Sequence, residues 1–106
     1  MGGSRSKVAP VVVRIELYGV VRDIVRESRV ELQLDDGDGA TFKDALEGLG
    51  REYGPALQDR LFDRYGPSSF VKVFAEGRLV TDLDQPLPST EGQAIRIIVF
   101  AAAGGG

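Results

Sequence analysis

The chain has 106 residues, of which 42% are hydrophobic, and 13 basic against 16 acidic side chains give it a net charge of −3. This size predicts one small domain, and the acidic balance argues against a nucleic-acid-binding surface. The sequence contains neither Cys nor His, which excludes disulfides, thiolate or imidazole metal ligands, Cys nucleophiles and a His general base.

The two ends of the chain differ in composition from the part between them. Residues 1–10 contain Gly2-Gly3-Ser4 and lack the apolar core of a secretory signal, so we expect a flexible leader. Residues 11–100 carry continuous patterning and predict the domain, and residues 101–106 predict a flexible tail. No apolar run approaches the roughly 20 residues that a membrane span needs. We therefore expect a cytoplasmic protein with no membrane partner.

Two alternating segments open the domain. Val11 to Tyr18 alternates in the period-2 manner of a half-buried strand, and Arg29 to Leu34 repeats the pattern. The pattern of Val20 to Arg26 between them fits either a short helical turn or a wide hairpin connection. The next segment, residues 35–39, crowds carboxylates but lacks the ligand spacing of a calcium loop, which favours a solvated acidic turn and no metal site.

A helix is predicted from Thr41, whose hydroxyl can cap the first turn together with Asp44. Apolar residues then recur at helical spacing up to Tyr53, forming one stripe. Gly54-Pro55 should end this helix. Residues 56–63 predict a further short helical turn that carries three apolar side chains inward, Leu57, Leu61 and Phe62.

The second half of the chain predicts three more strands. These are Phe70 to Ala75, Arg78 to Val80 after a Glu76-Gly77 hairpin turn, and Ile95 to Phe100 after a loop with two prolines. Strands on both sides of one main helix predict an α+β fold, a mixed sheet of four to five strands with the helix packed on one face. This is the order of the β-grasp, or ubiquitin-like, fold, in which the first and last strands would be central parallel neighbours.

One face of the predicted sheet should be apolar where a solitary domain would be polar. The helix-facing positions account for one set of Val and Ile residues: Val13, Ile15, Val71, Val73, Ile95, Ile97 and Val99. The opposite face still carries Phe74, Ile98 and Phe100, with Lys72 and Arg96 as a charged rim. A contiguous exposed patch of this kind predicts a partner-binding site. The alternative is that the tail or the proline loop folds back over it.

The last six residues are Ala101-Ala102-Ala103-Gly104-Gly105-Gly106. No side chain there can build a core, cap a helix or bind a ligand. The segment fits either a frayed end or a carboxylate on a flexible arm that reaches another protein's active site. Glycine suits a narrow channel because it lacks Cβ.

Three segments and the tail give the chain its resemblance to a known family. Leu17 to Ile24, Thr41 to Leu46 and the last loop, with its pieces Asp84 to Leu87 and Glu91 to Ile95, resemble in order and spacing the sulfur-carrier proteins of the MoaD and ThiS type. Gly105-Gly106 matches their diglycine end. MoaD is the small subunit of molybdopterin synthase. The chain departs from the family in having Ala101 to Ala103 where prolines are common, and in its third glycine.

The resemblance implies a carrier, not an enzyme in its own right. In the family the terminal carboxylate, here that of Gly106, is adenylated by a partner that uses ATP and is then converted to a thiocarboxylate for sulfur transfer. Gly104 and Gly105 would give access to the partner's channel, and no cofactor would be bound by the chain itself. The implied partners are a MoeB/ThiF-like adenylyltransferase, a sulfurtransferase or cysteine desulfurase and, for a molybdopterin pathway, a MoaE-like large subunit.

Three functions stay open at this point. The favoured one is a sulfur carrier for molybdopterin, that is, molybdenum cofactor, biosynthesis. The second is a ubiquitin-like modifier joined through its terminal glycine to target lysines. The third is a β-grasp binding module with an inert tail.

Overall fold

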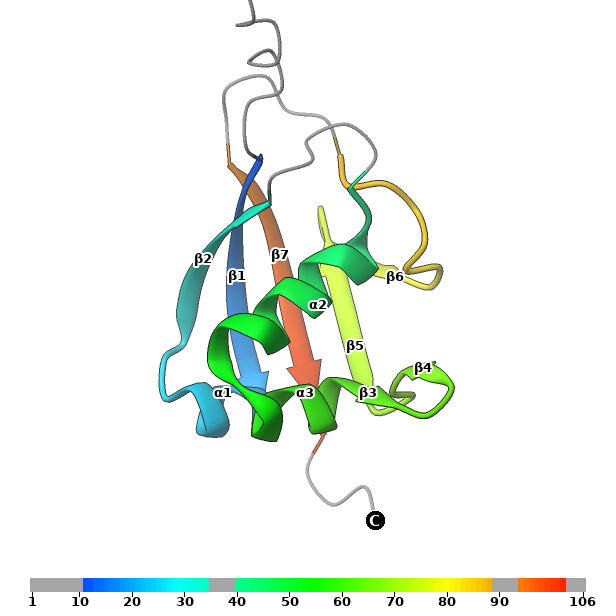
Figure 1. The fold of residues 1–106 in the computed structure, drawn as a ribbon. Coiled ribbons are helices and arrows are strands. Elements are labelled where there is room, and N and C mark those ends of the chain that lie inside the picture. Colours follow the sequence, from blue (N-terminus) through cyan, green and yellow to red (C-terminus); the bar gives the residue numbers. More distant parts are fainter. Residues whose placement is uncertain (1–10, 35–39, 89–93, 103–106) are drawn as a thin grey trace, which may run out of the picture.

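A computed structural model describes residues 11–34, 40–88 and 94–102 of the chain. These segments form one α+β body in which helices cover one side of a sheet (Figure 1). In chain order the elements are β1 (Val11–Gly19), α1 (Val20–Val25), β2 (Arg29–Leu34), α2 (Phe42–Tyr53), α3 (Pro55–Leu61), β3 (Phe62–Asp63), β4 (Gly66–Pro67), β5 (Val71–Ala75), β6 (Arg78–Val80) and β7 (Ile95–Ala101). No helix within the described ranges is long and apolar enough to cross a membrane.

The five-stranded sheet has the order β2-β1-β7-β5-β6, and β3 and β4 pair separately. β1 and β7 run parallel at its centre, with Val13 beside Ile95 and Tyr18 beside Phe100. The pairs β1·β2, β5·β7 and β5·β6 are antiparallel. The predicted β-grasp arrangement, with the first and last strands as central parallel neighbours, is therefore confirmed.

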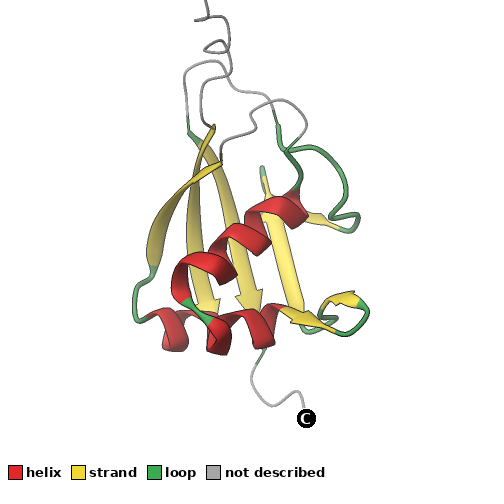
Figure 2. Cartoon of the chain, in the orientation of Figure 1, coloured by secondary structure: helices red, strands yellow, loops and turns green. Residues whose placement is uncertain are grey.

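Helix α2 lies diagonally across one face of the sheet (Figure 2). It begins at the predicted cap: the Asp44 amide donates to Thr41 Oγ1 at 3.1 Å, and the Thr41 amide donates to Asp44 Oδ2 at 2.9 Å. Its apolar stripe is buried against the strands, with Leu46 and Leu49 fully enclosed. Burial of side chains of this size stabilises the folded state by about 1.5–3 kcal/mol each.

The two short helices close one end of the molecule, on the side where the last described residue lies (Figure 1). The connection after β1, which the sequence leaves open, is helix α1. Helix α2 ends at Tyr53 as predicted, and Pro55 then begins α3 without further linker, since proline is well suited to the first helical turn. Leu57 and Leu61 of α3 are buried as expected, and Phe62 is partly buried.

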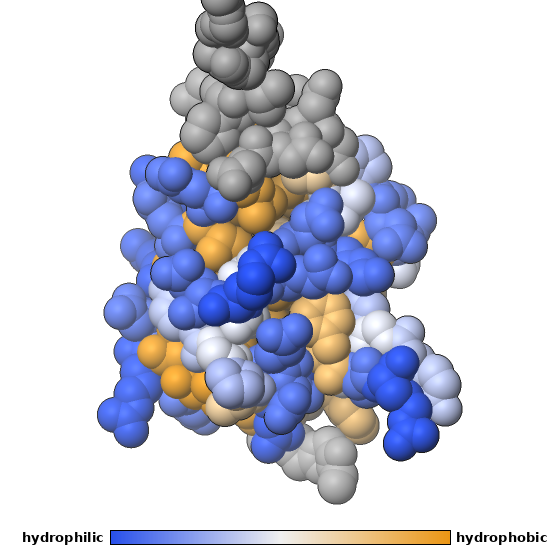
Figure 3. Space-filling view, viewed as in Figure 1, coloured by the Kyte–Doolittle hydropathy of each residue, from blue (hydrophilic) through white to orange (hydrophobic). Residues whose placement is uncertain are grey.

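Every position predicted to face the helix is buried at 6% exposure or less. The helix side of the molecule presents mainly hydrophilic side chains to solvent (Figure 3). The hairpin turn at Glu76-Gly77 is also confirmed, because both residues have positive φ and Ala75 pairs with Arg78, as in the tight turns that join antiparallel strands.

Three strand limits differ from the prediction. β1 ends at Gly19, one residue later than expected, and the other two differences are in β5 and β7. Phe70 lies just before β5, although its carbonyl accepts a hydrogen bond from the Ala102 amide at 3.3 Å. Ala101, which the sequence places in the tail, is the last residue of β7 and is 2% exposed because it pairs with both Gly19 and Val71. The leader at 1–10, the acidic turn at 35–39, residues 89–93 of the loop and the tail from 103 lie outside the described residues.

Candidate functional site

The predicted patch lies on the open face of the sheet, the face opposite α2. Phe74 and Ile98 are cross-strand partners on β5 and β7, and Lys72 and Phe100 form the next outward-facing pair. Phe74 and Ile98 are half-buried, and Phe100 is 38% exposed. The structure therefore brings Phe74, Ile98 and Phe100 together, with Lys72 and Arg96 at their margin as predicted.

The apolar surface is wider than the sequence indicated. Leu79 of β6 pairs with Phe74 and is 48% exposed, which extends the row Ile98–Phe74 across a third strand. Tyr18 of β1 is the parallel neighbour of Phe100 and is also exposed. We name these five the apolar row: Tyr18, Phe74, Leu79, Ile98 and Phe100. Sequence reasoning missed Leu79 although the predicted hairpin register would have paired it with Phe74.

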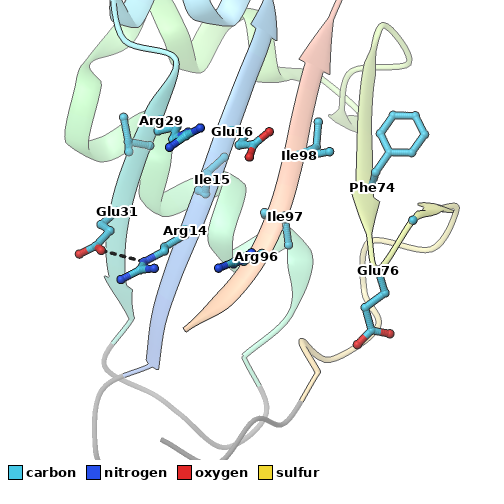
Figure 4. A pocket seen from close by; sticks show the side chains of 12 residues that line it. Arg14, Ile15, Glu16, Arg29, Glu31, Phe74, Glu76, Arg96, Ile97 and Ile98 are labelled. Carbon is cyan, nitrogen blue, oxygen red and sulfur yellow. Dashed lines mark hydrogen bonds and ion pairs between the residues drawn. The ribbon is translucent and has the colours of Figure 1, made fainter. Parts of the chain in front are cut away.

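The other half of the open face is charged. Arg14 Nε donates to Glu31 Oε2 at 3.0 Å, an ion pair between exposed side chains of β1 and β2. Arg96 of β7 stands beside Arg14 in the parallel register, so two guanidinium groups are neighbours on one face (Figure 4). A hollow of about 550 Å³ lies among these groups and reaches Phe74 and Ile98.

Tyr18 joins the two halves of the face. Its hydroxyl donates to Glu16 Oε1 at 3.0 Å, and Glu16 is the parallel neighbour of Ile98. This hydrogen bond, together with the charge of Glu16, raises the pKa of Tyr18 above its ordinary value of 10.0, because both favour the protonated phenol. The phenol is thus an uncharged donor over the physiological range.

The strand that carries the open-face residues also leads to the tail. β7 ends at Ala101, close against Gly19 at the end of β1, where an added Cβ would collide with the Ala101 carbonyl oxygen. The described chain stops one residue later, at Ala102. The predicted reacting residue Gly106 and the access residues Gly104 and Gly105 lie outside the described residues.

The described residues hold no group of three or more acidic side chains arranged to bind a metal. With no Cys or His in the sequence, the open face offers hydrogen-bonding, charged and apolar contacts but no nucleophile or metal centre of the usual kinds.

Comparison with known proteins gives structural neighbours only. No protein-family model matches the chain, and no curated protein matches it. The crystal structure of SAMP1 from Haloferax volcanii is 24% identical, covers 90% of this chain and 99% of its own, and has a TM-score of 0.71. The small archaeal modifier protein 1 of Methanosarcina acetivorans is 17% identical, covers 92% and 99%, and has a TM-score of 0.68.

A further similar structure is a Pyrococcus furiosus protein named as subunit 1 of a molybdopterin converting factor. It is 20% identical, covers 88% of this chain and 99% of its own, and has a TM-score of 0.64. These likenesses, all under 25% identical, confirm the fold. Because proteins with one fold serve different functions, the role of this chain is argued from its own residues.

Proposed function

We propose that the chain is a sulfur carrier whose Gly106 carboxylate is activated and sulfurated by other proteins, with molybdopterin biosynthesis as the pathway. The observation that carries this proposal is the dual use of β7. Ile98 and Phe100 of this strand lie in the apolar row, and the same strand leads directly into the Gly104-Gly105-Gly106 end. A partner docked on the open face would therefore lie beside the segment that bears the carboxylate.

The chemistry requires a partner at each step. The carboxylate would attack ATP in the partner's site, forming an acyl adenylate and releasing pyrophosphate. The persulfide of a sulfurtransferase or a cysteine desulfurase would then displace AMP and form an acyl disulfide. A thiol of the partner would reduce that disulfide, which releases the thiocarboxylate and leaves a disulfide on the partner. The chain itself supplies the acid, a tail without side-chain bulk, and the docking face. A MoaE-like large subunit is the proposed acceptor of the loaded carrier.

The reach of the tail sets a limit on this arrangement. Four residues follow Ala102, and a fully extended chain of four residues spans about 13 Å. The activating site must therefore lie within that distance of the end of β7. This four-residue arm is shorter than the six-residue arm expected from the sequence. Ala101 belongs to the sheet, and the Ala102 amide donates a hydrogen bond to the Phe70 carbonyl.

A second function is favoured by one observation, since two of the similar structures are named as small archaeal modifiers. In that case the adenylated carboxyl would form an isopeptide bond with lysines of target proteins. Activation is common to both functions, and only the acceptor differs.

The intact mass of the chain separates the possibilities. We would incubate it with cell extract, ATP and a sulfur source. Replacement of one oxygen by sulfur supports the carrier, isopeptide conjugates support the modifier, and an unchanged mass contradicts both and leaves an inert-tailed binding module. The matched control is a chain with one residue added after Gly106, which should abolish pyrophosphate exchange because the acid is displaced from the nucleotide.

Docking is tested by Phe100→Asp, which places a charge within the apolar row. We expect weaker binding to the activating enzyme with an unchanged circular dichroism spectrum. Tyr65→Asp is the control, since Tyr65 is 88% exposed and lies outside the open face, on the β3–β4 hairpin. Loss of folding in Phe100→Asp would show that this ring belongs to the core, and undiminished binding would exclude it from the docking surface.

A further inference from the structure

The open face has a charge opposite to that of the whole protein. Its outward positions on the strands hold four basic side chains, Arg14, Arg29, Lys72 and Arg96, and two acidic ones, Glu16 and Glu31. Glu76 of the adjoining turn adds a third carboxylate, so the face carries one net positive charge on a chain whose net charge is −3. Such segregation steers an oppositely charged surface toward one side of the molecule.

Arg96 and Lys72, the basic side chains next to the apolar row, have no ion-pair partner among the described residues. Arg14 is held by Glu31, and this is the one ion pair found among the described residues. Arg96 stands beside Arg14 and two positions from Ile98, and Lys72 is paired with Phe100. Like charges directly opposite each other destabilise a sheet. Glu31 compensates Arg14 here, and an anion beside Arg96 would compensate the second guanidinium group.

The shape of the face fits a side-chain-sized ligand group. The hollow of about 550 Å³ has Phe74 and Ile98 as its apolar wall. Its charged lining is three arginines and three glutamates: Arg14, Arg29, Arg96, Glu16, Glu31 and Glu76. Figure 4 shows these side chains around the same space, with Arg96 reaching toward β1. If an apolar side chain of a bound segment lay between Phe74 and Ile98, the polar groups next to it in that segment would be within reach of the Arg14 and Arg96 guanidinium groups.

We propose that this face binds an acidic protein segment in which an apolar side chain is flanked by carboxylates. The apolar side chain would sit on Phe74 and Ile98, and the carboxylates would contact Arg96 and Lys72. The inference rests on the proposed function in one respect, that the natural bearer of this segment is the activating partner. A nucleic acid fits less well, because the centre of the face is an apolar row and the chain as a whole is acidic.

The proposal is tested with a synthetic peptide that has a central leucine flanked by two glutamates on each side, capped at both ends. A comparison peptide has lysines in place of the glutamates. Amide chemical shifts of the full chain are followed by NMR during titration. We expect the glutamate peptide to shift Lys72, Phe74, Arg96 and Ile98, with the effect reduced by added salt, and the lysine peptide to shift none of them.

Charge reversal sharpens the result. Arg96→Glu and Lys72→Glu should each weaken binding of the glutamate peptide about threefold to tenfold. The double variant should gain affinity for the lysine peptide. Arg60→Glu is the matched control, because Arg60 is exposed on α3, away from the open face, and it should leave both titrations unchanged.

Three outcomes would overturn the proposal: equal binding of the two peptides, shifts confined to residues outside the open face, or no shifts at the highest peptide concentration. The titration uses no ATP, no activating enzyme and no reaction at Gly106. Failure of the proposed sulfur chemistry therefore leaves this result standing, and failure of peptide binding leaves the mass assay interpretable.

Discussion

The two faces of the five-stranded sheet are built from alternate residues of the same strands, yet they obey different rules. On the covered face, Ile97 and Val99 of β7 are buried at 2% exposure or less. On the open face, their neighbours Ile98 and Phe100 stay partly exposed, and Arg96 lies on the same face of β7. The covered face is explained by the stability of the domain, because burial of apolar area drives folding.

The open face needs another explanation. An isolated domain gains less stability from a half-exposed apolar row than from a buried one, because only the area removed from water contributes. The difference shows that alternation along a strand does not by itself separate residues that stabilise the fold from residues with another role. Residues that fold the domain and residues that we propose meet a partner are separated here by a single position along β7.

The largest expected effect comes from placing the same substitution on both faces. Ile97→Ala should lower the free energy of unfolding by about 2–5 kcal/mol, because it leaves a cavity in the core. Ile98→Ala, at the adjacent residue, should lower it by no more than about 1 kcal/mol. Urea denaturation of the two variants provides the measurement. Equal losses would abolish the distinction between the faces.

A smaller effect is expected at the end of β1, where the strand meets the last residue of β7. Gly19 has φ 76°, and an added Cβ would collide with the carbonyl oxygen of Ala101. Gly19→Ala should therefore destabilise the fold by about 2–4 kcal/mol, from backbone strain and overpacking together.

Gly77 provides the control for this substitution. It also has φ 76° but has open space around its Cα, so Gly77→Ala carries only the strain of about 1–2 kcal/mol. Gly19 also has ψ −144°, in a backbone region open almost only to glycine. The difference between the two variants therefore measures that strain together with the close contact between β1 and β7. Indistinguishable midpoints in urea would show that this contact relaxes freely.

The covered face could be predicted from sequence because its signals are local. The alternation of Val13 and Ile15, the helical stripe after Thr41 and the turn residues Glu76-Gly77 each determine structure within a few positions. Connection α1 is different: its six residues are too few for a period to show, and its helical state depends on the elements around it. The one-residue shift at Ala101 likewise depends on its pairing with Gly19 and Val71.

The open face could be predicted only in part, because its composition depends on register between distant strands. Alternation along β5 and β7 alone predicts five residues of this face: Lys72, Phe74, Arg96, Ile98 and Phe100. Arg14 becomes the neighbour of Arg96 through the parallel pairing of β1 with β7, and Tyr18 joins Phe100 in the same way. No local pattern contains that pairing, so the positive charge of the face was not visible in the sequence.

Substitutions at the cap of α2 test whether destabilising this helix affects the covered face alone. Thr41→Ala removes the hydroxyl that accepts from the Asp44 amide and should cost about 0.5–2 kcal/mol of stability. Thr41→Ser keeps the hydroxyl and should recover most of it. We expect the amide shifts of Ile98 and Phe100 to stay as they are in the wild type. Large changes there would show that the two faces are coupled through the sheet.

The smallest effect concerns ionisation on the open face. Because Glu16 raises the pKa of Tyr18, the interaction contributes to stability while the phenol is protonated, and the contribution is lost as the pH rises through the folded-state pKa. Glu16→Ala should bring the titration of Tyr18 back toward 10.0, followed by the absorbance of the phenolate, with Tyr18→Phe identifying its signal. Glu31→Ala, which removes a carboxylate paired with Arg14 instead, should leave that titration in place. If Tyr18 of the wild type titrates at its ordinary pKa, the hydrogen bond to Glu16 does not persist in solution, and Tyr18 then belongs to the partner-facing row by its ring alone.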